Sequence, residues 1–230
     1  MANTVYNSGS YTITVVGTED VAKALGDLKD KTPAAVKVAI NATAREARKL
    51  MIAKAKARYA VNAAGQKHLK ELVQRKKATN TSLNAELHIA SFRNDLGYFK
   101  YSPEGVHTGQ DVFKNAPPVV RAKVLKASSL KPLTGEARLS KGFVLQFKSG
   151  HIGMVQRVIG SNSSRKTTAR GYPRWTTKDG RVEKLRTMGS PSATAMHNTI
   201  WPEVEQQVED FLIKRLDQQV DKVLARAGKV

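Results

Sequence analysis

The sequence predicts an α+β fold in which long amphipathic helices pack on a central antiparallel β-sheet. Two observations carry this prediction. Apolar residues recur at spacings of three and four over residues 32–58 and again over 200–226, which is the helical period. In short segments between these two stretches, apolar residues alternate with polar ones, as in half-buried strands. With 230 residues, 40% of them hydrophobic, the chain can bury a sizeable core, and we interpret residues 1–230 as a single domain.

The N-terminal third is predicted to hold one strand and three helices. In residues 11–16 apolar residues alternate with Thr and β-branched side chains are enriched, which favours a strand, and a short helix is expected over 21–28. Thr32-Pro33 is a capping residue followed by proline at the first helical position, so a long helix is predicted to begin there and to reach about Tyr59. Its polar face is a basic ridge with Glu46 as its only acid. The ridge consists of Lys37, Arg45, Arg48, Lys49, Lys54, Lys56 and Arg58.

A second short helix is predicted over 66–77, where Arg75, Lys76 and Lys77 extend the positive surface. The apolar period then changes to two, which predicts strands over 84–92 and 96–101. Two further strands are expected, over 119–125 and 142–147. The second of these is followed by a glycine turn and a returning strand at 154–158, which together form a β-hairpin.

Two segments have the composition of extended loops. Residues 102–118 contain several Pro and Gly residues, and residues 160–190 are poor in apolar side chains and rich in basic ones. After the second loop, a long amphipathic helix is predicted from about 200 to 226, with Pro202 in its first turn. Acidic residues lie at its start and basic residues at its end, as the helix dipole favours.

The net charge of the chain indicates which kinds of partner it can bind. There are 39 Lys and Arg residues against 19 Asp and Glu, a formal net charge of +20 that attracts nucleic acid, acidic protein surfaces or anionic lipid. There is no cysteine, so disulfides and thiolate metal sites are excluded, and an intracellular assembly context fits best. No run of about 18 apolar residues occurs and the N-terminus lacks a secretory signal pattern, so we expect no membrane association.

Catalytic motifs are missing from the sequence. The five histidines are not at metal-ligand spacings, and there is no phosphate-binding glycine loop or nucleophile elbow, so we expect no enzyme activity, no metal and no cofactor. The basic loop is the better candidate for function. Its cations Arg165, Lys166, Arg170 and Arg174 are predicted to contact DNA phosphates in a channel or an acidic partner. Tyr172 and Trp175 stand among them, and Pro173 between them is equally typical of a loop that docks on a neighbouring subunit.

The order of elements resembles the minor tail protein Z family, the tail-completion proteins of tailed phages. The resemblance covers about residues 32–226. It rests on the basic helix around Asn41-Ala-Thr-Ala-Arg45, on the hairpin from Gly142 to Arg157, and on the turn Lys184-Leu-Arg-Thr-Met-Gly-Ser-Pro191 before the last helix. In the family this turn reads Leu-x-x-x-Gly-Pro-Ser, and the present chain departs from it because Ser190 separates Gly189 from Pro191.

The resemblance implies a structural virion protein of the phage neck. Such proteins form rings, commonly sixfold, at the head-proximal end of the tail and join tail to head around the DNA channel. The implied partners are further copies of the chain, the tail terminator, tube, head-completion or portal proteins, and the DNA backbone. The implied location is the virion, with assembly in the host cytoplasm. Subunit contacts are predicted at Phe143, Phe147, Met154, Tyr172, Trp175 and the outer positions of the last helix, with core packing as the alternative for Phe143 and Phe147.

Two other functions stay open at this point. A nucleic-acid-binding protein without sequence preference would explain the charge without any ring, and a steep salt dependence of its DNA affinity would favour it. A basic peripheral membrane protein ranks last, because the chain offers no aromatic-rich amphipathic anchor.

Overall fold

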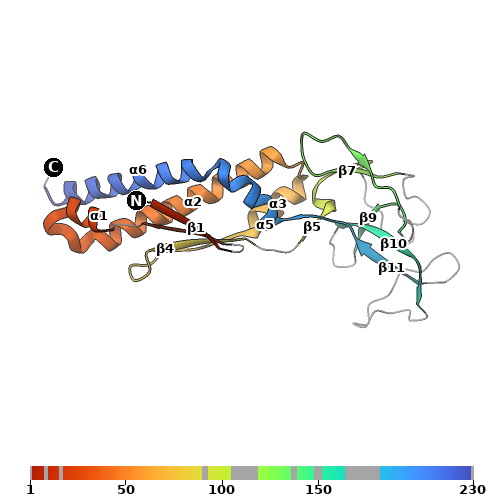
Figure 1. Ribbon diagram of the computed structural model, residues 1–230, viewed down its shortest axis with the longest axis horizontal. Helices are drawn as coiled ribbons and strands as arrows, with labels where there is room; N and C mark the ends of the chain where they lie inside the picture. The colour runs from red at the N-terminus through yellow and green to blue at the C-terminus, as the bar shows by residue number, and fades with distance from the viewer. Residues whose placement is uncertain are drawn as a thin grey trace. The chain divides into compact units, whose positions relative to one another are not determined.

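The structure is a computed structural model and describes residues 2–7, 10–15, 18–89, 93–104, 119–135, 139–147, 152–163 and 182–228. It confirms the α+β class, with long helices and antiparallel sheets (Figure 1). Where the sequence was interpreted as one domain, the chain groups into two compact units, each built from separate segments. Unit 1 comprises residues 1–55, 69–92 and 192–230, and unit 2 comprises residues 56–68 and 93–191.

Unit 1 contains a four-stranded antiparallel sheet in the order β1-β2-β4-β3. Its strands are β1 (Ala2–Asn7), β2 (Ser10–Val15), β3 (Val73–Lys76) and β4 (Asn84–Ile89). One face of β4 is apolar because Ala85, Leu87 and Ile89 alternate with polar residues, and all three are completely buried. On the neighbouring strand, Ile13 pairs with Ala85 and is also completely buried. The alternation seen in the sequence therefore produces the core face of this sheet.

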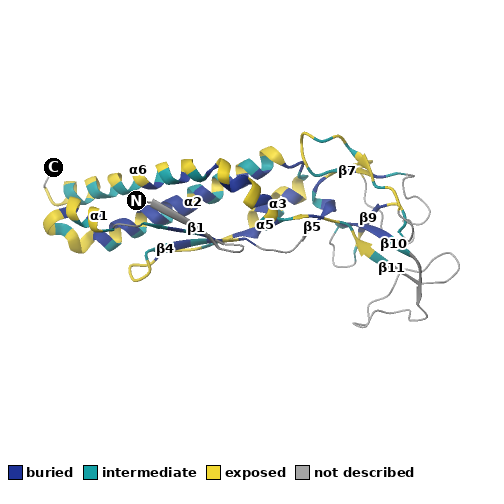
Figure 2. Ribbon diagram, in the orientation of Figure 1, coloured by how far each residue is buried: buried dark blue, intermediate teal, exposed yellow. Residues whose placement is uncertain are grey.

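The predicted long helix is present as α2 (Thr32–Arg58), whose residues 32–55 belong to unit 1, and it begins at the expected Thr-Pro pair. It is preceded by α1 (Thr18–Leu25) and the 3₁₀ segment η1 (Gly26–Lys31). Figure 2 shows buried residues, in dark blue, along α2. Many of them are alanines, among them Ala39, Ala44 and Ala47, and such small side chains let a helix pack closely on its neighbours. Its buried and exposed residues follow the helical period, which is why the sequence predicted it correctly.

The helix predicted from about 200 to 226 is not continuous. It consists of the 3₁₀ turn η3 (Trp201–Glu203) and the helix α6 (Glu205–Arg226), and the helix α5 (Ala193–Ile200), which was not predicted, precedes them. Pro202 lies in the 3₁₀ turn, where its missing N–H interrupts the backbone ladder. The interruption places the ring of Trp201 against Tyr11, with the centroids 4.4 Å apart, and the Tyr11 hydroxyl donates to Asn198 Oδ1 at 2.8 Å. These contacts fasten the C-terminal segments to β2.

His197 of α5 is a buried base in unit 1. It is completely buried, and within the described part of the chain neither ring nitrogen has a hydrogen-bond partner. Desolvation by burial lowers the pKa of His197 from 6.5 to about 4. Below pH 6.5 the unfolded chain therefore takes up a proton that the folded chain does not accept until the pH approaches 4.

We expect the free energy of unfolding to fall as the pH drops from 7 to 5, by about 2 kcal/mol from this group. Well above pH 6.5 His197 is neutral in both states and has no effect on the pH dependence. Urea unfolding of the parent chain and of His197→Leu at pH 7 and pH 5 measures this difference. The exposed residue His88 supplies the control, because His88→Gln should keep the loss. If His197→Leu and the parent chain lose the same free energy of unfolding between pH 7 and pH 5, the loss does not come from His197.

Unit 2 contains the predicted hairpin. Strands β9 (Phe143–Gln146) and β10 (Ile152–Ser163) pair antiparallel, and β11 (Val182–Thr187) pairs with the other edge of β10. The predicted loop 160–190 is therefore wrong in part: β10 continues to residue 163 and pairs with β11 through 182–187, because long-range pairing outweighs the polar composition. The end of that loop also forms a strand, β12 (Gly189–Ser192), which pairs with β5 (Arg93–Asp95).

A third small sheet in unit 2 has the order β6-β7-β8. Its strands are β6 (Lys100–Ser102), β7 (Arg121–Lys123) and β8 (Lys131–Pro132). The predicted strand 96–101 begins instead with a 3₁₀ turn, η2 (Leu96–Tyr98), because the Asp95 carboxylate accepts a hydrogen bond from Gly97 N–H at 2.7 Å. The strands predicted to form one central sheet thus belong to three separate sheets.

The predicted helix 66–77 is α3 (Ala63–Leu72), and its last residues form β3 instead. Val73 and Arg75 pair with Ile89 and Leu87 of β4, so the helix ends where β4 offers a strand partner. None of the helices in the described ranges is long and apolar enough to cross a membrane.

Candidate nucleic-acid interface

Three arginines of unit 1 form a cluster that we call the arginine cluster: Arg45, Arg48 and Arg75. Arg45 and Arg48 lie one helical turn apart on α2, so their side chains share one side of the helix. Arg75 belongs to β3, the edge strand of the sheet. The residues come from segments about 27 positions apart in sequence and meet because α2 lies beside this edge.

The cluster is held by hydrogen bonds to the backbone. Arg48 donates from Nε to the carbonyl oxygen of Val73 at 2.8 Å and from Nη2 to that of Lys70. The Arg75 guanidinium donates to the carbonyl oxygen of Asn41 at 3.4 Å. Two carbonyl acceptors restrict the guanidinium of Arg48 to one orientation. Because this side chain is already ordered in the free protein, binding an anion costs less conformational entropy.

Asn41 supports the same edge from α2. Its side chain donates to the carbonyl oxygen of Ala78 and accepts from the Ala78 N–H, both at 3.0 Å. This pair of hydrogen bonds ties the segment that follows β3 to the helix. The backbone that carries Arg75, Lys76 and Lys77 is therefore fixed at both ends, by Arg48 and by Asn41.

Positive charge dominates the arginine cluster. Burial lowers the pKa of Arg75, and the positive charges of Arg45 and Arg48 lower it further. The nearby acids are engaged elsewhere: Glu46 pairs with Lys49 at 3.2 Å, and Glu86 pairs with Lys76 at 3.3 Å. Within the described ranges, none of the three guanidinium groups forms an ion pair with a carboxylate.

Mutual repulsion of this kind is relieved by an anion. Guanidinium groups present paired N–H donors that match the oxygens of phosphate, and Arg is for that reason frequent at phosphate contacts. Exposed lysines that neighbour the cluster in sequence, or whose backbone Arg48 contacts, would widen such a contact. They are Lys49, Lys70, Lys76 and Lys77. The arrangement is suited to binding a polyanion through its backbone charge rather than to reading a sequence.

No family model matches the chain, and searches of curated proteins and of solved structures find no similar protein. The interpretation of the arginine cluster therefore rests on its geometry and charge. In the part of the chain that the structure describes, no group of three or more His, Cys, Asp or Glu side chains is placed to hold a metal ion.

The basic loop predicted from the sequence lies outside the described residues. It holds Arg165, Lys166, Arg170 and Arg174, together with the aromatic residues Tyr172 and Trp175. Their predicted contacts with DNA or with a neighbouring subunit stay predictions.

The three predicted contact residues of the hairpin lie in unit 2. The exposed fraction of Phe143 is 6% and that of Met154 is 0%, so both side chains are in the core of the unit and not at its surface. Phe147 is partly buried and packs against the cluster of Phe143, Leu145 and Val155. The core alternative that the sequence left open for the two phenylalanines thus describes their environment in the folded chain.

The sequence identified the basic ridge but not its organisation. Arg45, Arg48 and Arg75 were all assigned to positive surface, but nothing in the sequence indicates that Arg75 meets the other two. Lys54 belongs to the ridge in sequence, yet its ammonium lies 3.6 Å from Glu203, so part of its charge is offset. Asn41, which fixes the edge beside Arg75, has no sequence signal beyond being a polar residue in an apolar stretch.

Proposed function

We propose that the chain is a structural subunit of the neck of a tailed phage, a tail-completion protein that joins tail to head around the DNA channel. The observation that carries the proposal is the arginine cluster on an α+β subunit. It is a positive surface held in place by backbone acceptors and lacking carboxylate partners within the described ranges. A structural role, with no catalytic step, is part of the proposal.

The mechanism follows from charge. A subunit with a net charge of +20 repels its own copies, so a ring of several such subunits needs a compensating negative partner. DNA passing through the ring, or acidic surfaces of adjacent neck and tail proteins, would provide it. In this scheme the arginine cluster faces the polyanion, and subunit contacts involve Tyr172, Trp175 and the outer positions of α6. The exposed Ile213 of α6, with 51% of its surface accessible, is an apolar position available for such a contact.

A nucleic-acid-binding protein without sequence preference is the second candidate, because the same arginine cluster favours it. The two functions differ in assembly. A neck subunit forms a ring when a tail end templates it, whereas a nucleic-acid-binding protein of this class needs no ring and remains bound along DNA.

Electron microscopy of particles tests the proposal. Phage or tail particles from the host should show labelled chain at the head-proximal end of the tail, as a density with rotational symmetry. Deleting the gene should leave heads and tails unjoined, and supplying the chain in trans should restore joined particles. Absence of the chain from every particle, combined with salt-sensitive DNA binding, would overturn the neck role in favour of the second candidate.

A further inference from the structure

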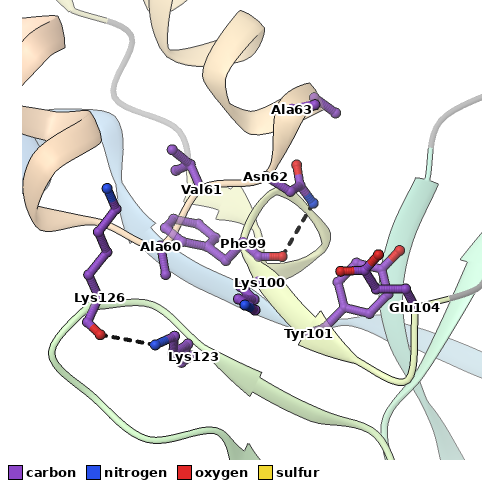
Figure 3. Close-up of a pocket in the computed structure, with 11 residues that line it drawn as sticks. Ala60, Val61, Asn62, Ala63, Phe99, Lys100, Tyr101, Glu104, Lys123 and Lys126 are labelled. Atoms are coloured by element: carbon purple, nitrogen blue, oxygen red, sulfur yellow. Dashed lines mark hydrogen bonds between the residues drawn. The ribbon is translucent and has the colours of Figure 1, made fainter.

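Unit 2 contains a pocket of about 730 Å³. This volume lies within the range of about 300–1,000 Å³ that is typical of small-molecule sites. Figure 3 shows its lining, which comes from the segment before α3, from β6 and from the region of β7. Phe99 and Ala60 are buried and form apolar parts of the wall, while polar side chains stand at the rim.

The first notable feature of the pocket is a pair of like charges. Lys100 of β6 and Lys123 of β7 are directly opposite each other in the antiparallel pairing, so both side chains emerge on the same face. Like charges in this relation destabilise a strand pair. A third lysine, Lys126, lines the same pocket, and its carbonyl oxygen accepts a hydrogen bond from Lys123 Nζ at 2.9 Å. Across the described ranges, none of these three lysines forms an ion pair.

The second feature is a fixed backbone around the lysines. Lys100 N–H donates to the Ala60 carbonyl at 2.7 Å, and Ala60 N–H donates to the Val124 carbonyl at 2.8 Å. The side-chain amide of Asn62 donates to the carbonyl oxygens of Gly97 and Phe99 and accepts from Gly65 N–H. Asn62 thereby caps α3 and also fixes the backbone of Gly97 and Phe99 beside the pocket. The backbone next to Lys100 and Lys123 is therefore held in place by hydrogen bonds within the unit.

The first turn of α3 also lines the pocket, through Ala63 and Ala64. N–H groups at the start of a helix have no acceptor within that helix, and their partial positive charge favours an anionic ligand.

The pocket has a second, different end. Tyr101 and Glu104 line it together, and Figure 3 shows their side chains next to each other. Burial raises the pKa of Tyr101, and the Glu104 carboxylate raises it further, so the phenol stays protonated and able to donate. The Glu104 carboxylate accepts hydrogen bonds from hydroxyl or amino groups. A ligand that fits both ends carries an anion at one side and hydroxyl or amino groups at the other.

We propose that this pocket binds a nucleoside phosphate, with the phosphate at Lys100, Lys123 and Lys126 and the sugar or base donors toward Tyr101 and Glu104. The phosphate supplies the negative charge that the lysine pair lacks, and the apolar wall accommodates the nucleoside. Either a free nucleotide or the terminal nucleotide of a strand presents this chemistry. Nucleotide binding in this pocket does not depend on ring formation. The pocket can therefore bind a nucleotide even if the neck role is wrong, and the neck role can hold even if the pocket binds no nucleotide.

Calorimetric titration of the isolated chain tests the site with thymidine 5′-monophosphate, thymidine and inorganic phosphate. The Arg45→Glu/Arg75→Glu background is used so that the arginine cluster does not contribute. We expect the monophosphate to bind and thymidine not to bind. Lys100→Gln and Lys126→Gln should each weaken binding about tenfold, the effect of losing one charge-assisted contact. Lys131→Gln is the matched control, because Lys131 is an exposed lysine on β8 of the same sheet that does not line the pocket.

A thermal measurement separates binding from folding. Lys123→Gln should raise the unfolding temperature of the free chain, because it removes the repulsion with Lys100, and should abolish the shift produced by the nucleotide. An eight-nucleotide oligothymidylate with and without a 5′-phosphate distinguishes the two sources. Stronger binding of the phosphorylated strand would show that the ligand of the pocket is the end of a strand. If neither strand binds, the ligand is a free nucleotide. Equal binding of inorganic phosphate and monophosphate, or unchanged binding in Lys100→Gln and Lys126→Gln, would overturn the proposal.

Discussion

Reversing the charge of Arg45 and Arg75 together should lower the affinity for duplex DNA at about 0.1 M salt by on the order of 100-fold. Two contacts of the arginine cluster with phosphate would be lost and replaced by repulsion. The slope of log affinity against log salt should fall by about two, one for each lost phosphate contact. Arg48 is left in place, because it donates to the carbonyl oxygens of Val73 and Lys70 and its loss would disturb the sheet edge. Fluorescence anisotropy across a salt series measures both quantities.

The matched control is Lys29→Glu/Lys31→Glu, which changes the net charge by the same amount on the exposed segment η1 of unit 1. We expect this variant to lose less than about threefold in affinity, with a nearly unchanged slope. If the two double variants lose the same affinity, the net charge of the chain and not the arginine cluster governs binding, and the assigned surface is wrong. Circular dichroism of both variants verifies that the fold is retained.

Gly65→Ala should destabilise the chain by about 3 kcal/mol or more. A Cβ atom at Gly65 would lie 2.2 Å from the carbonyl oxygen of Tyr98, a distance that the two atoms cannot occupy. This oxygen has little freedom to move, because it accepts a hydrogen bond from Asn62 N–H at 3.0 Å. Relief of the clash therefore requires breaking that bond or displacing the start of α3. The free energy of unfolding in urea measures the loss.

Ala64→Ser is the control for this variant, since Ala64 is exposed in the same helical turn and the change should stay within about 0.5 kcal/mol. The nucleotide affinity of the pocket should also fall in Gly65→Ala, because Asn62 and the first turn of α3 form part of its wall. A Gly65→Ala chain with parental stability would show that α3 does not approach Tyr98 as closely as described here.

The elements that local pattern decides were predictable from the sequence. The start of α2 at Thr32-Pro33 was predicted because proline is favoured in the first turn of a helix. The predicted capping role of Thr32 is not confirmed, since its hydroxyl has no hydrogen-bond partner within the described residues. The β9–β10 hairpin was predicted because its two strands are adjacent in sequence, so their pairing needs only the alternation and a glycine turn. The α+β class followed from the two periods and is confirmed.

The errors arose where partners are distant in sequence. Val73–Lys76 follows helical residues without a breaking residue, and only the pairing with β4 makes it a strand. Likewise, β11 pairs with β10 across residues that composition alone assigned to a loop. The candidate site shows the same limit. Positive residues were visible in the sequence, but the Arg48 contacts with Val73 and Lys70 and the alignment of Lys100 with Lys123 depend on the fold.

The position of Arg48 against β3 has a consequence for the chain before any partner is met. An edge strand offers unpaired N–H and C=O groups to other chains, and uncovered edges lead to aggregation. At β3 the guanidinium of Arg48 donates a hydrogen bond to the carbonyl oxygen of Val73. The neighbouring charges of Arg75, Lys76 and Lys77 repel a second positive chain that approaches this strand. The opposite edge strand, β1, contacts α6. We therefore expect the β3 edge to resist pairing with a second copy of the chain, so that newly synthesised copies stay apart before a partner is met.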